Sequence, residues 1–296
     1  MTPTQADTPA GSLPPEMSVV LVTHNSNDVL PRCVAALAAQ RGLRLEVVVI
    51  DNGSAIKPAG VEDFALLVSN RDNPGFAVAC NQGARLARAP WLLFLNPDCF
   101  PGPDDLLQLL QIATAHPQIG ILGAQLLEAN GQLQPASRRR DPTPERLLQA
   151  IRRGRAALEP VAVPMESVLE YAEAVSGALM LVPRAAFEHV GGFDEGYRLH
   201  FEDLDLCRRM RAAGWQVGLA PHLRVVHLKG TSSRRRPLWV AIQKHRGLLR
   251  YFERFDAHRL RFPQRLLFRS LLWCALPVLM LAALRPTDSR SRSLNQ

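Results

Sequence analysis

The chain has 296 residues, 47% of them hydrophobic, and a formal net charge of +8. This length and composition exclude a wholly disordered chain and predict one large domain with an appendage. The excess of basic residues favours acidic partners such as phosphates, nucleic acid or an anionic membrane.

Residues 1–16 are rich in proline, threonine and alanine, and they lack the basic and apolar regions of a secretory signal. We therefore expect a disordered tail there. The five cysteines of the chain have no C-x-x-C spacing, so they indicate neither a disulfide framework nor a zinc site. A reducing compartment fits this pattern best.

A strand–helix–strand pattern follows the tail. Residues 18–26, SVVLVTHNS, are an apolar, β-branched run that ends in polar residues, and residues 45–54, LEVVVIDNGS, repeat the pattern. A helical stretch lies between them, which predicts a βαβ unit with a parallel, buried sheet. Ligands of such sheets bind outside the carboxyl ends of the strands. Thr23 and Asn25 should therefore share one crevice with Asp51 and Asn52.

Asp51 ends the second predicted strand, where a carboxylate can accept a hydrogen bond from a ligand. The first loop reads THNS, so the dinucleotide fingerprint G-x-G-x-x-G is absent. A nucleoside would offer either its ribose hydroxyls or the imide N–H of uracil or thymine. The alternative is that Asp51 forms an ordinary Asx-turn with Gly53.

The next strands are predicted at residues 65–69 and 91–95, with a helix between them at 76–87. The second of these strands ends in Asn96-Pro97-Asp98. A carboxylate at Asp98, with the amide oxygen of Asn96 two residues earlier, predicts a site for Mg²⁺ or Mn²⁺. The alternative is an ordinary N-P-D turn.

A basic insert is predicted at residues 138–160, after a helix at 104–115 and a strand at 119–124. Residues 138–159 hold seven arginines and three acids, a net charge of +4 (7 − 3). We expect this insert to be mobile and partly helical, and to contact an anionic ligand or lipid headgroups. The alternative is a solvated face.

The densest pattern lies at residues 176–217. An apolar run at 178–182 predicts a buried strand, Gly191 and Gly192 allow a sharp turn, and an acidic cluster then leads into a helix. Glu202 and Asp203 should lie at the N-terminus of this helix, where its dipole favours ionised carboxylates. Such a carboxylate can accept a proton. The alternative is that both residues only cap the helix.

Two more strands are predicted at residues 216–220 and 223–227. The second ends in His227, which as a lone histidine is more often structural than a ligand. A flexible loop with Lys229 and a run of three arginines follows, suited to folding over a phosphate.

The C-terminal region begins with a predicted helix at residues 237–255. Residues 271–284 are uncharged and apolar and lie between Arg269 and Arg285. Fourteen residues are too few for an ordinary membrane span, so we expect a peripheral or in-plane membrane segment. The alternatives are a helix packed on the domain or a dimer interface.

Seven motif segments occur in this order along the chain: VVLVTHNS (19–26), VVVIDNGS (47–54), NPGFAVACNQG (73–83), LFLNPD (93–98), SGALMLVPRAAFEHVGGFDE (176–195), FEDLDLCRR (201–209) and VVHLKGTSS (225–233). With them the chain resembles the inverting, family 2-type glycosyltransferases of GT-A fold, which include bacterial rhamnosyltransferases of cell-wall and surface-polysaccharide synthesis. The resemblance covers roughly residues 17–255.

This resemblance implies an α/β, Rossmann-like GT-A fold with a mixed, mostly parallel sheet flanked by helices. Residues 17–236 would be the catalytic domain. Residues 237–296 would be a C-terminal helical region with a membrane-associating segment. The implied reaction is transfer of a sugar, expected to be L-rhamnose from dTDP-rhamnose.

The resemblance also implies roles for single residues. Asp51 would contact the nucleotide base in a pocket lined by Thr23 and Asn25. Asp98 would hold the divalent metal, and Asp203 would be the catalytic base, with Glu202 as a second catalytic candidate that positions the acceptor. His227 would contact the metal or the diphosphate. Further candidates for contact with the nucleotide or substrate are Asn52, Gly75, Phe76, Asn81, Asn96 and Lys229. Asn96 stands where many relatives have the first acid of an Asp-x-Asp motif, which removes one charge from the metal site.

The expected partners are a nucleoside-diphosphate sugar donor and a glycan or lipid-linked acceptor, without nucleic acid, and a homodimer is left open. The expected location is the cytoplasm, peripheral on the inner face of the cytoplasmic membrane. One alternative is a sugar-phosphate nucleotidyltransferase, which would need a glycine-rich basic loop where residues 23–29 read THNSNDV. The other is a non-catalytic nucleotide-sugar-binding protein of the same fold.

Overall fold

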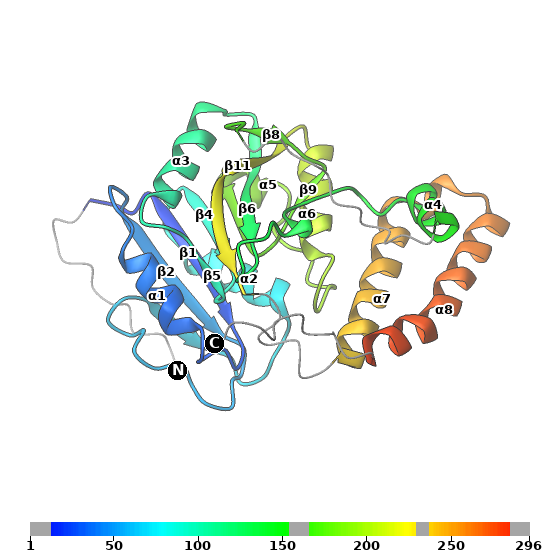
Figure 1. Cartoon of the computed structure of the whole chain (residues 1–296), viewed down its shortest axis with the longest axis horizontal. Coiled ribbons are helices and arrows are strands. Elements are labelled where there is room, and N and C mark those ends of the chain that lie inside the picture. Colours follow the sequence, from blue (N-terminus) through cyan, green and yellow to red (C-terminus); the bar gives the residue numbers. More distant parts are fainter. Residues whose placement is uncertain (1–12, 154–165, 229–236, 285–296) are drawn as a thin grey trace, which may run out of the picture.

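The computed structural model describes residues 13–153, 166–228 and 237–284, and a nine-stranded sheet lies at its centre (Figure 1). The strands of this sheet are β1 (Met17–Thr23), β2 (Leu45–Asp51), β3 (Leu66–Ser69), β4 (Trp91–Leu95), β5 (Cys99–Phe100), β6 (Ile119–Leu127), β8 (Glu170–Tyr171), β10 (Leu179–Pro183) and β11 (Gln216–His227). Their order is β3-β2-β1-β4-β10-β6-β11-β5, and β8 pairs with β11. β7 (Arg138–Arg139) and β9 (Ala174–Val175) form a separate two-stranded sheet.

Helices cover both faces of the large sheet. The helices are α1 (Leu30–Ala38), α2 (Phe76–Leu86), α3 (Asp105–Ala115), α4 (Pro144–Arg153), α5 (Arg184–His189), α6 (Glu202–Ala212), α7 (Pro237–Phe255) and α8 (Phe262–Leu284). Because side chains alternate along a strand, Val19 and Leu21 of β1 pack in one core with α1 and α3. Val20 packs on the other face, in a core with α2, α5 and α6. The predicted mixed, mostly parallel α/β fold is confirmed.

The strand directions determine where a ligand can bind. β1 is parallel to β2 and β4, and Thr23 lies opposite Asp51 at their carboxyl ends. β10 runs antiparallel to β4 and to β6, whereas β11 is parallel to β6. The carboxyl ends of β1, β2, β4 and β11 therefore meet at one edge of the sheet. The residue that precedes β10 lies at the same edge, because Asn96 donates its backbone N–H to the Ala178 carbonyl (2.9 Å).

One strand differs from the prediction. Residues 216–220 and 223–227, expected as two strands, belong to the single strand β11. Its pairing with β6 is irregular between Ala220 and Arg224. Pro221 lies in this irregularity, and proline has no N–H to donate to the ladder, so the strand bends there and continues.

The basic insert is more ordered at its start than expected. Arg139 is part of β7, which pairs with β9, and α4 follows. Three of its arginines lie in ion pairs within the protein: Arg138 with Glu170, Arg139 with Asp203 and Arg146 with Glu173. Contact with external anions was expected of these side chains, and the structure instead gives them internal acidic partners. Residues 154–160 of the predicted insert lie outside the described residues.

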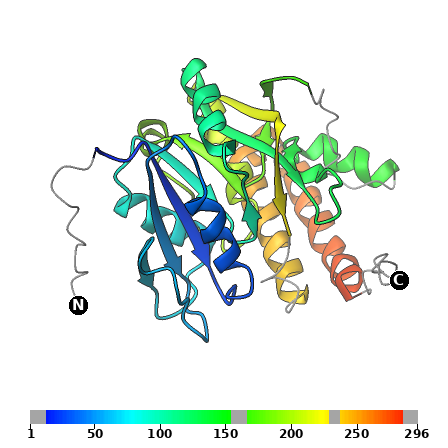
Figure 2. The ribbon, with the colours of Figure 1, turned by 60° about the vertical axis from the view of Figure 1, so that its left-hand side comes forward.

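The C-terminal helices α7 and α8 lie side by side at one end of the molecule (Figures 1 and 2). A small separate core joins them to α4 through Leu147, Phe252 and Phe268, with the two phenylalanine rings 4.6 Å apart. The apolar residues 271–284 form the second part of α8, which begins at Phe262. Within the described ranges, none of the helices is long and apolar enough to cross a membrane.

Candidate active site

Asp98 and His227 lie together at the carboxyl edge of the sheet. Asp98 follows β4, and His227 ends β11. The antiparallel pairing of β5 with β11 sets His227 opposite Cys99, and Leu228 donates its N–H to the Asp98 carbonyl (3.0 Å). As a result, His227 Nε2 is 3.3 Å from Asp98 Oδ1, and both side chains are buried.

Gln134 fixes the state of the His227 ring. Its Nε2 donates to the carbonyls of His227 (2.6 Å) and Leu127 (3.2 Å), which leaves its Oε1 as an acceptor 2.9 Å from His227 Nδ1. Nδ1 must then carry the proton, and a neutral imidazole has its lone pair on Nε2. Nε2 faces the Asp98 carboxylate. A proton on Nε2 would be donated to that carboxylate, and a cation in place of the proton would be bound by both groups.

These side chains fit one divalent cation. Ligand atoms of Asp98, Cys99 and His227 all lie within 4.8 Å of one another. The Cys99 thiol donates to the Ala178 carbonyl (3.3 Å), and burial raises its pKa well above the usual value, so it stays neutral. The remaining ligand atoms are a carboxylate oxygen and an imidazole nitrogen. This pair suits Mn²⁺ better than Mg²⁺, because Mg²⁺ prefers oxygen ligands alone.

Asp203 lies near this pair, in the first turn of α6. Its Oδ2 accepts the Gly177 N–H (2.9 Å) and an N–H of the Arg139 guanidinium, and its Oδ1 accepts the Leu204 N–H (2.8 Å). Gly177 is the neighbour of Ala178, whose carbonyl binds the turn before Asp98. Two adjacent residues thus connect Asp203 with the Asp98 turn.

Burial and neighbouring charges shift the pKa values of Glu202 and Asp203 in opposite directions, so the two carboxyl groups differ in protonation state. Burial would raise the pKa of Asp203, but the charge and hydrogen bond of Arg139 outweigh it and hold this pKa below the usual range. Burial and the Asp203 charge raise the pKa of Glu202 to about 8. Its Oε2 is buried and has no hydrogen-bond partner among the described residues. At neutral pH Asp203 is therefore ionised and Glu202 is protonated.

The entry into α6 is strained. His200 and Phe201, directly before Glu202, have left-handed φ angles of 65° and 74°, which side chains other than glycine rarely adopt. Gly247 of α7 packs against them: a Cβ there would lie 2.9 Å from the Phe201 ring. The position of α7 therefore bears directly on the backbone that carries Glu202 and Asp203.

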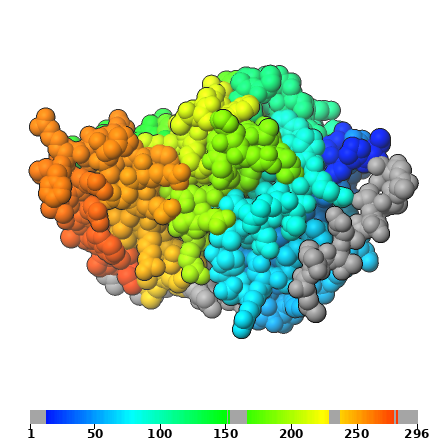
Figure 3. Space-filling view, turned by 180° about the vertical axis from the view of Figure 1, so that it is seen from behind, coloured from blue at the N-terminus to red at the C-terminus, as the bar shows by residue number. Residues whose placement is uncertain are grey.

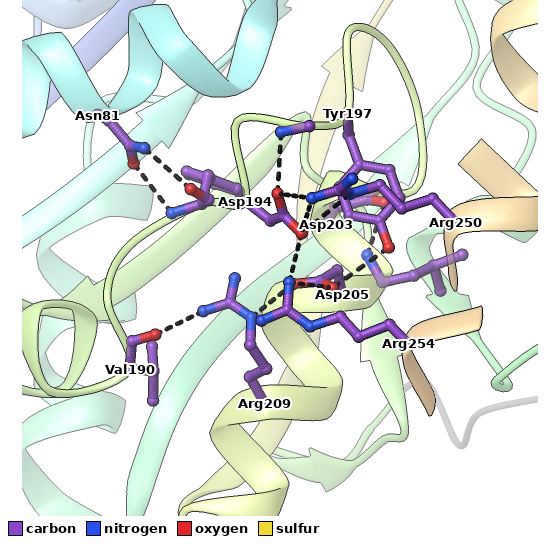
Figure 4. Close-up of polar contacts among 12 residues, drawn as sticks. Asn81, Val190, Asp194, Tyr197, Asp203, Asp205, Arg209, Arg250 and Arg254 are labelled. Atoms are coloured by element: carbon purple, nitrogen blue, oxygen red, sulfur yellow. Dashed lines mark hydrogen bonds and ion pairs between the residues drawn. The ribbon is translucent and has the colours of Figure 1, made fainter. Parts of the chain in front are cut away.

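An ion-pair network joins α6 and α7 beside this turn (Figure 4). Asp194 accepts from Arg250 (2.8 Å) and Arg254 of α7. Asp205, fully buried, accepts from Arg209 (2.5 Å) and lies 3.2 Å from Arg254. Asp205 thus binds arginines, as its place in the helix body predicts, and it is not available as a base.

The loops after β1 and β2 are bonded to each other. The Asn25 N–H donates to Ser54 Oγ (2.8 Å), and its Oδ1 accepts the Ala55 N–H (2.9 Å). Asp51 Oδ1 accepts from Ser54 Oγ (2.5 Å) and Ser54 N–H (3.2 Å), so its carboxylate is bonded within its own loop to the residue three positions on, and not to Gly53 as in the Asx-turn named as the alternative. Thr23 Oγ1 is buried and has no hydrogen-bond partner in the described ranges.

Asn52 ties this pocket to the loop before α2. Its Nδ2 donates to the Gly75 carbonyl (3.1 Å), and its Oδ1 accepts from Asn70 (2.9 Å). Gly75 has φ +111°, and a Cβ there would lie 3.1 Å from the Arg198 carbonyl, so only glycine fits. The next residue, Phe76, donates its N–H to the same carbonyl (3.3 Å).

Asn81 was expected to contact the nucleotide, but its side chain forms hydrogen bonds within the protein. Its side chain is buried, with Oδ1 accepting the Phe193 N–H (2.9 Å) and Nδ2 donating to the Phe193 carbonyl (2.9 Å) and to Glu195 (3.0 Å). Its hydrogen bonds therefore hold the loop that leads to Asp194, within the protein. Lys229 lies outside the described residues.

Comparison with known families identifies the chain. The family model for Glycosyl transferase family 2 matches residues 18–161, and that for Glycosyl transferase family group 2 matches residues 159–291. Together they span nearly the whole chain. The chain is a family 2-type glycosyltransferase.

Sequence relatives of this glycosyltransferase include two rhamnosyltransferases. The N-acetylglucosaminyl-diphospho-decaprenol L-rhamnosyltransferase of Mycobacterium tuberculosis is 28% identical, over 94% of this chain and 97% of the relative. The rhamnosyltransferase WbbL of Escherichia coli is 26% identical, over 71% of this chain and 82% of the relative.

Solved structures share the fold. The mannosyltransferase PcManGT of Pyrobaculum calidifontis, in complex with GDP-Man and Mn²⁺, superposes with a TM-score of 0.58 at 19% identity, over 92% of this chain and 74% of that one. TarS of S. aureus (residues 1–349, with UDP) gives 0.55 at 14% identity, over 91% and 81% of the two chains. At this identity the likeness shows the fold alone.

Three residues of the glycosyltransferase site escape sequence reasoning: Gln134, Arg139 and Gly177. Arg139 stands in a run of three arginines that looks like a solvated face. Gln134 contacts His227 from 93 residues away, and no local pattern marks it. Gly177 carries a weak signal, because it opens the SGALM segment, where a glycine before a strand marks a close backbone approach.

Proposed function

We propose that this glycosyltransferase moves a sugar, with inversion, from a nucleoside-diphosphate donor to a glycan or lipid-linked acceptor in cell-wall or surface-polysaccharide synthesis. The observation that carries the proposal is that an Asp–His pair and a separate ionised carboxylate lie close together at one sheet edge. Asp98 and His227 would form a cation site, and Asp203 is the carboxylate linked to it through Gly177 and Ala178. Inverting transfer needs these two groups, a cation for the leaving diphosphate and a base for the acceptor.

We assign the binding site of the nucleotide-sugar donor to the loops after β1, β2 and β4. Asp51 would accept from the base, with Thr23 and Asn25 beside it, and the rigid hydrogen bonding of Asn25 and Asp51 keeps this pocket preformed. Asp98 and His227 would hold Mn²⁺ or Mg²⁺, which when bound neutralises the negative charge of the diphosphate. Gln134 keeps the His227 lone pair turned towards that position.

Asp203 is assigned as the proton acceptor. Its low pKa suits an acceptor hydroxyl that becomes acidic only as its oxygen bonds to the sugar carbon, so that the proton moves late in the step. Glu202, protonated and with a free buried oxygen, would position the acceptor hydroxyl by a hydrogen bond. The diphosphate is a good leaving group, and no second acid is required.

The proposed donor is dTDP-rhamnose, from which L-rhamnose would be transferred. The names of the two relatives, each a rhamnosyltransferase, support this sugar. A carboxylate at Asp51 suits the imide N–H of thymine. The name of the mycobacterial relative also supports a lipid-linked acceptor, a sugar on a polyprenyl diphosphate.

Binding and turnover test the proposal separately. Thermal shifts with dTDP, UDP and GDP, each with and without Mn²⁺, should show one preferred nucleotide whose effect needs the metal. Asp98→Ala should lose this metal dependence. Asp203→Asn should keep nucleotide binding and lose about 10²- to 10⁴-fold in turnover. Full turnover in excess EDTA, or near-normal turnover of Asp203→Asn together with loss in Glu202→Gln, would contradict the assigned roles.

Peripheral membrane contact through α8, on the inner face of the cytoplasmic membrane, is part of the proposal. It is supported by exposed apolar side chains along α8, which lies at the outer end of the molecule (Figure 3). These side chains are Phe262, Leu266, Leu267, Leu271 and Trp273. Arg265 and Arg269, on the same helix, both pair with Glu253 of α7, and because their side chains are half exposed they would also reach anionic lipid headgroups.

Vesicle sedimentation with phosphatidylglycerol tests this contact. Leu267→Asp should release the protein from vesicles, because a charge would enter the apolar layer. Leu133→Asp is the matched control, since Leu133 is 48% exposed but lies on the turn after β6. If neither variant changes sedimentation, and Leu267→Asp instead converts a dimer to a monomer in light scattering, α8 is a dimer interface.

A further inference from the structure

We propose that Arg139 is a positioning residue for Asp203: from β7 it holds the carboxylate in one orientation and supplies its counter-charge. This inference rests on the proposed role of Asp203 as proton acceptor. Nothing in the sequence singles out Arg139 from its neighbours Arg138 and Arg140.

The first support is the rigid mounting of the Arg139 side chain. Arg139 pairs with Ala174 across the β7–β9 ribbon, and its Nη2 donates to the Val175 carbonyl (2.8 Å) as well as to Asp203. The chain leaves β9 at Val175 and continues through Ser176 to Gly177, whose N–H donates to the same Asp203 oxygen. One donor to Oδ2 therefore comes from β7 and the other from the turn directly after β9, its partner strand, and the two donors together orient the carboxylate.

The second support is the close packing of Gly177 against the Asp203 side chain. A Cβ at Gly177 would lie 3.1 Å from the Asp203 Cβ, so the glycine is needed for the side chain to reach this position. Arg139 and Asp203 are both largely buried, with side-chain exposures of 13% and 12%. A pair held this far from water is only weakly screened by solvent.

The third support is the charge of the groups around Asp203. Burial raises the pKa of Cys207 to about 12, and burial together with Lys244 lowers the pKa of His200 to about 4, so both are neutral at pH 7. Glu202 is protonated there. Arg139 is the positive group bonded directly to Asp203. Without it, two buried carboxyl groups adjacent in sequence would compete for ionisation, and Asp203 would take up a proton at higher pH.

The pH profile of kcat/KM tests the inference. In Arg139→Gln, the acid limb should move up by about one pH unit or more, so kcat/KM should fall at pH values below the shifted limb and recover as the pH rises above it. Arg139→Lys keeps the charge and should keep the wild-type limb, with a lower kcat. Nucleotide affinity should be unchanged in both. Arg146→Gln, which removes an ion pair with Glu173 on the same segment, should leave the limb in place.

A uniform loss of turnover at every pH, without movement of the limb, would mean that Arg139 is merely structural. If Arg139→Gln does not fold, Gly177→Ala replaces it, because the added methyl group should turn the carboxylate away from Arg139 and move the limb in the same direction.

An NMR titration of the Asp203 carboxyl group does not depend on enzyme activity, so it tests this inference separately from the proposed function. The carboxyl ¹³C signal of Asp203 should titrate at higher pH in Arg139→Gln than in the wild type. Equal titration in the two proteins would overturn the inference even in an active enzyme. Absence of transfer with every donor would overturn the proposed function and leave the carboxyl titration interpretable.

Discussion

Gly247→Ala tests how tightly α7 controls α6, the helix that begins with Glu202 and Asp203. The new Cβ would lie 2.9 Å from the Phe201 ring and 3.2 Å from the His200 carbonyl. Neither neighbour gives way easily, because His200 and Phe201 already have left-handed backbone angles and Glu202 follows at once. Relief must come from a shift of α7 or of the turn that enters α6.

Two effects on stability oppose each other in this variant. Alanine in a helix interior is more stable than glycine by about 1 kcal/mol, and the overpacked contact costs about 1–3 kcal/mol. The free energy of unfolding should therefore fall by no more than about 2 kcal/mol. The effect on turnover should be larger, since a displacement of ~1 Å at a reacting group can cost about 10²-fold.

Turnover, nucleotide affinity and urea unfolding should be measured together. We expect Gly247→Ala to lower kcat strongly, to leave nucleotide affinity unchanged and to stay folded. Arg246→Ala, on the exposed side of the same helix, is the control and should leave all three quantities near wild type. Wild-type kcat in Gly247→Ala would refute the reasoning that α7 holds the entry of α6.

Three further predictions concern stability and reactivity. Asp256→Asn breaks the buried two-bond pair with Arg208 (2.8 and 3.0 Å) and should lower the free energy of unfolding by about 3 kcal/mol; urea unfolding equal to wild type would contradict this. Cys274 is exposed whereas the other four cysteines are buried, so a thiol reagent should label one cysteine rapidly in the folded protein, and Cys274→Ser should abolish that fast phase. The pKa of Glu202 is raised in the folded state from 4.5 to about 8, so its contribution to stability is present below pH 4.5 and is lost as the pH rises to 8. Glu202→Gln should therefore raise the melting temperature relative to wild type more at pH 8.5 than at pH 5, and an equal difference at the two pH values would speak against the shift.

The sequence was sufficient for the sheet and its carboxyl edge because these depend on local patterns. Apolar runs with polar ends predict β1, β2 and β4, and β4 is found at the predicted residues, Trp91–Leu95. The helix predicted to begin near Glu202 does so. The break predicted within β11 is wrong, since Pro221 lies in an irregularity that the pairing with β6 absorbs.

The long-range partners of the site could not be predicted. Arg139 reaches Asp203 across 64 residues, and Gln134 reaches His227 across 93. Each depends on which loops the sheet brings together, and a run of arginines or a turn glutamine looks the same in a solvated loop. Asn81 misleads for the same reason: its position in a motif predicts a ligand contact, but the fold presents Phe193 and Glu195 to it.

The contacts of α7 show that this helix packs as part of the sheet domain, although the sequence pattern groups it with the C-terminal appendage. Tyr251 is fully buried in the core that holds α2, α5 and α6. Arg250 and Arg254 pair with Asp194, on the loop that leads to α6. By contrast, α8 contributes to a small core shared with α4 and α7, and many of its apolar side chains are exposed. Because α7 touches both the entry of α6 and α8, a displacement of α8 would reach Asp203 through α7.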